Sequence, residues 1–204
     1  MEFYSFIISI FLAIGLSAAC GFRIFIPPLT YGFLYRADLV QLEDGWTWIG
    51  NEWVIAVLAL ASIVEICANL IPWLDNFLDV LATPTSIAAG TVLSSSCLSN
   101  FDPGLQWMLS VMSGVLITGG FQFATVGIRG LSSVFTGGCF NPIFSIIEDI
   151  ISIVITLSII LFPLIGIIII ILIAFLIWRL YLIMMRRKRV LRTENTENEN
   201  FRKS

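Results

Sequence analysis

Acidic side chains inside otherwise apolar sequence are the residues of this chain best suited to chemistry. Glu65 interrupts a long apolar stretch, and an ionisable group within a membrane helix costs several kcal/mol unless it is paired or hydrated. We expect Arg129, Glu148 and Asp149 near the same end of the molecule. Arg129 would compensate one acid and leave another free to bind a cation or a proton, although a purely structural ion pair is equally consistent with the sequence.

Three further charged residues complete the set of binding candidates. Arg23 is a second partner for the acids, and its segment would place it nearer the outer end unless that segment re-enters. Asp75 and Asp79 are spaced i and i+4, so both carboxylates share one helix face. This pair suits a cation site or an interfacial segment, and we favour the interfacial segment. The adjacent Glu148 and Asp149 would point about 100° apart, so one of them is expected to face headgroups.

The residue types argue against an enzyme. The chain contains no histidine, which removes Ser-His and Cys-His nucleophilic pairs and histidine metal ligands. The four cysteines lie singly in apolar sequence, without the spacing of a redox or zinc motif, and are expected to be small buried apolar residues. We therefore expect no catalytic residue, no metal ion and no cofactor.

Composition indicates an all-α integral membrane protein. Apolar residues make up 58% of the 204 residues and charged residues 12%, against about half and a quarter in soluble domains. A helix needs about 20 mostly apolar residues to cross the hydrocarbon core, and the long uncharged stretches suffice for about six crossings. Residues 1–187 are expected to form this polytopic domain, and 188–204 a basic, then polar, disordered cytoplasmic tail.

The charge distribution predicts the topology. Only three basic residues precede Trp178, and the other eight follow it, most of them directly after the last apolar run. The positive-inside rule therefore places the C-terminus in the cytoplasm of an inner membrane. The acidic, tryptophan-rich segment 36–53 and the turn at 102–104 are expected outside. With about six crossings, the N-terminus would also be inside.

Two stretches do not suit simple spans. Residues 21–35 contain Gly21, Arg23 and Pro27-Pro28, and 130–142 are rich in Ser and Gly and end in Asn141-Pro142. Both are predicted to be broken or re-entrant, and irregular backbone at membrane depth survives only when it is buried in protein or lines a cavity. Between them, small residues recur about every four positions on one helix, which predicts a packing seam; they are Ser110, Gly114, Thr118, Gly120 and Ala124.

Several of these segments resemble a known family, the bacterial membrane proteins of the domain of unknown function 4126. The resemblance rests on SAACGFRIFIPPLTYGFL at 17–34, WVIAVLALASIVEICANLIPWLDNFLD at 53–79, AAG at 88–90 and SIIEDIISIVITLSIILFPLIGI at 145–167. It implies a membrane fold and names no substrate. The family pattern has Asp-Lys where this chain has Asn69-Leu70, and Arg-Pro where it has Ser86-Ile87, so two charged features are missing.

Two functions of different classes follow from these features. The first is a small transporter or channel in which membrane-embedded carboxylates, Glu65 above all, bind an ion or small solute. The alternative is a non-transporting membrane scaffold or lipid-interacting protein whose charges pair internally. In either case the expected partners are the lipid bilayer and anionic headgroups at the basic tail, with no nucleic acid, and a homo-oligomer is compatible with the sequence.

Overall fold

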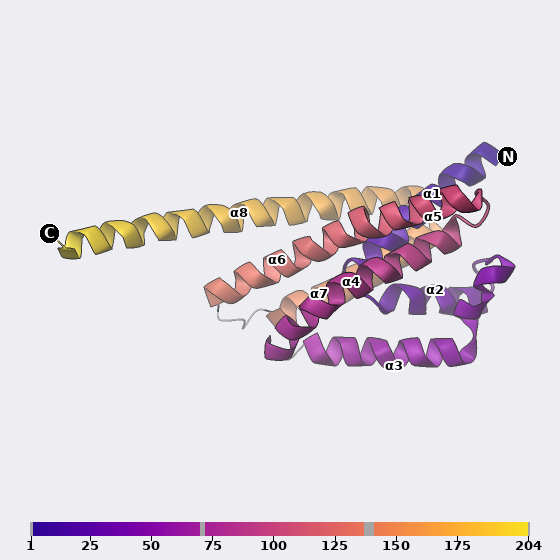
Figure 1. The fold of residues 1–204 in the computed structure, drawn as a ribbon, viewed down its shortest axis with the longest axis horizontal. Helices are drawn as coiled ribbons and strands as arrows, with labels where there is room; N and C mark the ends of the chain where they lie inside the picture. Colours follow the sequence, from indigo (N-terminus) through magenta and orange to yellow (C-terminus); the bar gives the residue numbers. More distant parts are fainter. Residues whose placement is uncertain (1, 70–71, 137–140, 204) are drawn as a thin grey trace.

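The computed structural model describes the backbone of residues 2–69, 72–136 and 141–203, and the side chains of 4–68, 81–133 and 141–183. Every element in these ranges is a helix, as the sequence predicts (Figure 1). In chain order they are α1 (Glu2–Cys20), α2 (Ile26–Arg36), the 3-10 helix η1 (Asp44–Gly50), α3 (Glu52–Asn69), α4 (Pro72–Cys97), α5 (Pro103–Met112), the π-helical turn η2 (Ser113–Thr118), α6 (Gly119–Thr136), α7 (Asn141–Leu161) and α8 (Pro163–Lys203).

The first two helices form a hairpin that opens at one end of the bundle. α1 runs inward from the N-terminus, the chain turns at 21–25, and α2 returns toward η1 (Figure 1). Phe6 near the start of α1 stacks on Phe101 beyond α4, with ring centroids 4.6 Å apart, which ties the N-terminal end of α1 to this end of the bundle. The predicted break therefore lies at 21–25. Both limbs open at the same end (Figure 1), which agrees with the re-entrant alternative for this segment.

The number of spans is smaller than the six expected. Within the described residues, three helices are long and apolar enough to cross a membrane, at Pro103–Ser133, Asn141–Leu161 and Pro163–Ile183. A fourth results if Asp44–Gly50 and Glu52–Ala68, which meet at an angle of 54°, count as one span. The apolar helix Tyr4–Cys20 is shorter. The break at 21–25 explains part of the difference, because it divides one long apolar stretch into two limbs below the roughly 20 residues of a span.

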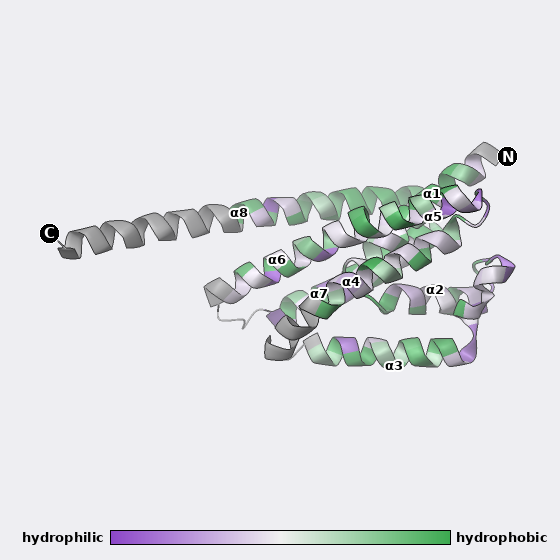
Figure 2. Cartoon of the chain, in the orientation of Figure 1, coloured by the Kyte–Doolittle hydropathy of each residue, from purple (hydrophilic) through white to green (hydrophobic). Residues whose placement is uncertain are grey.

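The hydropathy of the surface agrees with a membrane protein. Apolar residues dominate α3 and the described part of α8, and hydrophilic residues gather at the turns near η1 and before α5 (Figure 2). Many large apolar side chains of α8 are exposed, among them Ile168 (66%) and Ile171 (64%). A water-soluble chain rarely exposes such a continuous apolar surface, whereas lipid is a suitable solvent for it.

α1 occupies the centre of the bundle despite its short length. It packs against α4, α7, α8 and η2, and Leu16, Ala18, Ala19 and Cys20 near its end are fully buried. Since α1 ends inside the bundle, its last carbonyl groups need partners. Hydroxyl groups supply them: Thr118 donates to the carbonyl of Ser17 at 2.7 Å and Ser152 donates to that of Ala19 at 3.1 Å.

The predicted small-residue seam is partly confirmed. Ser110, Gly114 and Thr118 are buried, and a Cβ on Gly114 would overlap the hydroxyl of Thr91 on α4. Gly120 is exposed, and a Cβ there would meet nothing within 4 Å. Gly120 comes only two residues after Thr118, which is about 200° around the helix, so it faces away from the seam.

The second predicted break is wrong over most of its length. α6 continues to Thr136, so 130–136 are helical, while 137–140 lie outside the described residues. The serine and glycine content does not interrupt the helix, because Ser133 donates its hydroxyl to the carbonyl of Arg129 at 3.0 Å, a bond compatible with helix geometry. Leu131 and Ser132 are buried, so packing also supports this turn.

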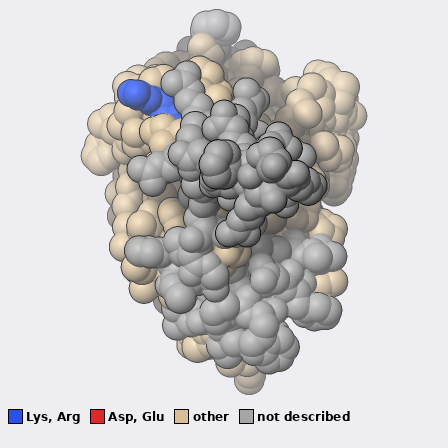
Figure 3. All heavy atoms as spheres, turned by 90° about the vertical axis from the view of Figure 1, so that its left-hand side faces the viewer, with Lys and Arg blue, Asp and Glu red and all other residues tan. Residues whose placement is uncertain are grey.

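α8 extends past the other helices toward the C-terminus, and its backbone is helical through most of 188–204, where the sequence predicts a disordered tail (Figure 1). Side chains beyond 183 lie outside the described ones, and a separate cytoplasmic tail stays a prediction. Figure 3 looks onto this end of the molecule: the described atoms are mostly uncharged, with basic atoms at one edge.

Candidate functional site

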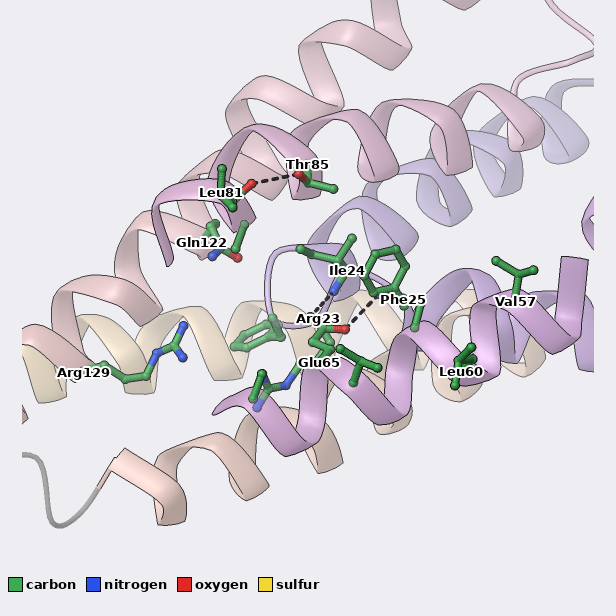
Figure 4. Close-up of a pocket in the computed structure, with 15 residues that line it drawn as sticks. Arg23, Ile24, Phe25, Val57, Leu60, Glu65, Leu81, Thr85, Gln122 and Arg129 are labelled. Atoms are coloured by element: carbon green, nitrogen blue, oxygen red, sulfur yellow. Dashed lines mark hydrogen bonds between the residues drawn. The ribbon is translucent and has the colours of Figure 1, made fainter. Parts of the chain in front are cut away.

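The turn between α1 and α2 carries the centre of the site. Pro27 and Pro28 lack N–H groups, so the first turn of α2 leaves fewer unpaired donors than an ordinary helix start. The N–H groups of Ile24 and Phe25 just before it donate to the carboxylate of Glu65 on α3, at 2.9 Å and 3.2 Å (Figure 4). Glu65 thus binds the positive end of a half-helix inside the bundle, the arrangement by which helix N-termini bind anions.

Arg23 points from the same turn toward α7. Its Nε lies 2.5 Å from Oδ1 of Asp149, its Nη2 lies 3.7 Å from Oε2 of Glu148, and it donates to the carbonyl of Ser145 at 2.7 Å. Arg23 is 1% exposed. The diverging donors of one guanidinium therefore bind two adjacent acids. The expectation that either Glu148 or Asp149 faces headgroups is wrong, because both contact Arg23.

Arg129 completes the cluster from α6. Its Nε lies 3.6 Å from Oε1 of Glu148, and the two residues are 4% and 6% exposed. Glu148 therefore lies between two arginines from elements far apart in sequence. The structure brings together five of the seven candidates predicted from sequence, and we call them the charged cluster; they are Arg23, Glu65, Arg129, Glu148 and Asp149.

The remaining two candidates lie on α4. The backbone of Asp75 and Asp79 is helical, and their side chains fall outside the described residues. Their assignment as a cation site or an interfacial segment stays a prediction. Within the described residues, no group of three or more His, Cys, Asp or Glu side chains has the arrangement of a metal site.

A cavity of about 640 Å³ opens beside the charged cluster. Its walls come from the 22–25 turn, α3, α4 and α6, and most of its lining is apolar. Arg23, Glu65, Gln122 and Arg129 are its main polar side chains, and Figure 4 shows Arg129 directed toward the cavity from α6. Val57 and Leu60 on α3 line it and are 65% and 64% exposed, so the cavity opens toward the surface beside α3.

Sequence reasoning missed two parts of this site. One is the role of the backbone N–H groups of Ile24 and Phe25 as the partners of Glu65. The signal was present in Gly21 and Pro27-Pro28, which predicted a broken helix, and broken helices expose such donors. The other is Gln122, which is polar, 4% exposed and part of the cavity wall, but has no distinctive sequence context.

The cysteines are free thiols within the described part of the chain. Cys20 and Cys97 are buried, as expected, whereas Cys67 is exposed on α3, and Cys139 lies outside the described residues. The hydroxyl of Tyr31 lies 3.9 Å from Sγ of Cys97. None of the described cysteines belongs to the charged cluster.

Comparison with known proteins leads to a family. Residues 10–182 match the model of the family described as Domain of unknown function (DUF4126). The comparisons found no similar curated protein and no similar solved structure. The matched range includes the turn at 21–25, α3, α6 and α7, and so the whole charged cluster. As the match covers most of the chain, this protein belongs to the DUF4126 family.

Proposed function

We propose that this protein is a multi-pass inner-membrane transporter or channel that uses Glu65 as a proton- or cation-binding carboxylate at the broken α1–α2 hairpin. The charged cluster contributes fixed charge and holds the hairpin against α7. No enzymatic step is part of this function. The apolar helices that could cross a membrane support the location.

The observation that carries the proposal is the choice of partners within the charged cluster. If Glu65 had a purely structural role, we would expect it to form an ion pair with the nearest arginine. Arg23 instead binds Asp149, Glu148 and Ser145, all on α7. Glu65 accepts hydrogen bonds from two neutral backbone donors, the N–H groups of Ile24 and Phe25. Hydrogen bonds from neutral N–H groups hold an acid in place without fixing its charge, so Glu65 can gain a proton or a cation while the ion pair of Arg23 with Asp149 stays intact.

The broken hairpin supports the same function. Discontinuous helices with half-helix N-termini at their binding sites are a recurring feature of secondary transporters. The turn at 21–25 is interrupted backbone buried within protein, and a cavity adjoins it. Both conditions allow irregular backbone at membrane depth.

The orientation in the membrane is part of the proposal. The basic residues after Trp178 favour a cytoplasmic C-terminus. Because α1 and α2 open at the end of the bundle opposite to that toward which α8 extends (Figure 1), the N-terminus would lie outside. This differs from the arrangement expected for about six crossings.

Flux through reconstituted protein tests the proposal. Purified protein in liposomes should dissipate an imposed gradient of protons or of a monovalent cation, followed with a pH-sensitive dye or an ion-selective electrode. Glu65→Gln should reduce the rate about tenfold or more, since the amide cannot carry the charge. Glu52→Gln, an exposed acid on the same helix that pairs with Arg36 at 2.9 Å, is the matched control and should retain the rate. Folded wild-type protein that moves neither protons nor monovalent cations would overturn the proposal.

A scaffold or lipid-interacting role is the second candidate. The pairing of Arg23 and the close approach of Gly90 to Thr118 and of Gly114 to Thr91 favour it, because they are features of tight helix packing. This role predicts that Glu65→Gln changes neither flux nor any cellular activity except through stability. The same variant therefore separates the two functions.

A further inference from the structure

A second cavity, of about 420 Å³, lies at the end of the bundle where α1 and α2 open. It is distinct from the cavity beside the charged cluster, and we call it the outer cavity. Its walls come from the middle of α1, Tyr31 on α2, the segment 39–44 at the start of η1, the end of α4 with the turn after it, and the end of α7. Its polar lining residues are Ser9, Tyr31, Gln41, Glu43, Asp44, Ser96, Ser99 and Asn100.

The charges around the outer cavity are of one sign. Glu43 and Asp44 line it and are exposed, and no basic residue belongs to the described lining. The basic side chain described nearest in the chain, Arg36, is bound to Glu52 at 2.9 Å. Clefts lined by one sign of charge concentrate counter-ions by about tenfold or more. The rim is therefore complementary to cations.

The floor of the outer cavity is polar and buried. Tyr31 and Ser96 are each 4% exposed and reach the cavity, and the hydroxyl of Tyr31 lies 3.9 Å from Sγ of Cys97. Ser96 donates its hydroxyl to the carbonyl of Leu93 at 2.7 Å, and a hydroxyl oxygen has two acceptor lone pairs besides its donor, so both hydroxyls keep capacity to bind water. Buried polar groups are usually satisfied by protein or by ordered water, and a cavity of this volume holds several waters. The floor is thus suited to hydration.

A single short helix joins this floor to the proposed binding carboxylate. Tyr31 lies on α2, six residues beyond Phe25, whose N–H donates to Glu65. At 1.5 Å per residue this separation is about 9 Å along the helix axis. The outer cavity and the Glu65 site therefore lie along the same half-helix, one nearer the bundle end and the other at its interior terminus.

We propose that the outer cavity is a hydrated vestibule that admits small monovalent cations, protons included, toward the Glu65 site. Glu43 and Asp44 set its charge preference, and Tyr31 and Ser96 hold water at its floor. This inference deepens the proposed function and rests on it for the destination of the cation. The vestibule itself is tested without any transport measurement.

The test uses the native thiol of Cys97, which lines the outer cavity. The variant carries Cys20→Ala, Cys67→Ala and Cys139→Ala, so that Cys97 is its single cysteine. We measure the rate at which Cys97 reacts with two membrane-impermeant methanethiosulfonates, one carrying trimethylammonium and one carrying sulfonate. Each reaction forms a mixed disulfide and releases methanesulfinate. Ser99→Cys in a variant that also has Cys97→Ala gives a second reporter nearer the rim, should Cys97 react too slowly.

At each reporter cysteine we compare the rate of the cationic reagent with that of the anionic one. This ratio should be about tenfold higher at Cys97 than at Gly104→Cys, which lies on the exposed first turn of α5 at the same end of the bundle. Glu43→Gln with Asp44→Asn should remove most of this preference, and high salt should reduce it. Asp38→Asn is the matched control, because Asp38 is an exposed acid nearby that does not line the cavity and its positive φ of 56° is tolerated by Asn. It should leave the preference unchanged.

Two results would overturn the vestibule. One is protection of both reporters from both reagents in folded protein, which would show a dry cavity. The other is equal reaction with the two reagents, or a preference that survives Glu43→Gln with Asp44→Asn. If instead the preference appears as expected but liposomes show no flux, the vestibule stands and the proposed transport function fails.

Discussion

Nε of Arg23, on the turn between α1 and α2, lies 2.5 Å from Oδ1 of Asp149 on α7. This ion pair joins the α1–α2 hairpin to a helix more than a hundred residues later in the chain. The same guanidinium donates to the carbonyl of Ser145, so a single side chain fastens the turn to α7 over about one helical turn. The hairpin is therefore held in place by charge as well as by packing.

Removing Arg23 should destabilise the protein strongly. Arg23→Gln leaves the buried Glu148 and the partly buried Asp149 without this cation, and breaking a buried ion pair on one side costs about 3–5 kcal/mol. Thermal unfolding of purified protein in detergent, followed by loss of helical circular dichroism, measures the effect. Arg36→Gln is the control: Arg36 is exposed and paired with Glu52, so its loss should cost about 1 kcal/mol or less. Equal stability of the two variants would contradict this account of the charged cluster.

Glu65 should contribute less to stability than Arg23, and its effect should depend on the substitute. Glu65→Ala leaves the N–H groups of Ile24 and Phe25 without their acceptor, at a cost of about 1–3 kcal/mol. Glu65→Gln keeps a carbonyl oxygen that accepts from one of them, so the loss should be smaller. The same unfolding measurement ranks the variants. If Glu65→Gln were the less stable of the two, backbone capping would not be the main contact of Glu65.

The two termini should lie on opposite sides of the membrane. α1 and α2 form a hairpin that opens at the end of the bundle where the N-terminus lies, whereas α8 runs to the opposite end (Figure 1). A reporter active only in the cytoplasm should therefore work when fused after Ser204 and fail when fused before Met1, and a periplasmic reporter should show the reverse. Both termini on one side would show that the first segment crosses.

Close packing of α4 against the π-helical turn should be sensitive to a single methyl group. Gly90→Ala places a Cβ over the Thr118 hydroxyl, and Thr118 is held by its bond to the carbonyl of Ser17, so we expect a loss of about 1–3 kcal/mol. Gly120→Ala is the matched control on the neighbouring helix, where the added Cβ meets nothing within 4 Å. There the higher helix propensity of Ala should leave stability equal or raised by up to about 1 kcal/mol. A tolerated Gly90→Ala would mean that the two helices separate easily.

The sequence alone was sufficient to predict the family, the apolar helical character of the chain and the first break. Apolar composition determines a helical membrane-type protein, because backbone groups in lipid must be satisfied within each segment. Gly21 and Pro27-Pro28 indicated a broken first segment, since proline removes donors and cannot continue a helix inward. Glu65 could be recognised as a candidate site residue because an ionisable group within apolar sequence is energetically costly.

Only the tertiary structure decided which charges meet and which way the broken segment goes. A broken helix can continue across or turn back with the same residues, and the packing of α1 between α4, α7 and α8 makes it turn back. From the sequence, Arg23 could form an ion pair with Glu65 or with the acids of α7. The position of the turn places it beside Asp149, and Glu65 accepts hydrogen bonds from Ile24 and Phe25. Local patterns specify residue types and breaks, whereas contacts between residues far apart in sequence depend on how the helices pack.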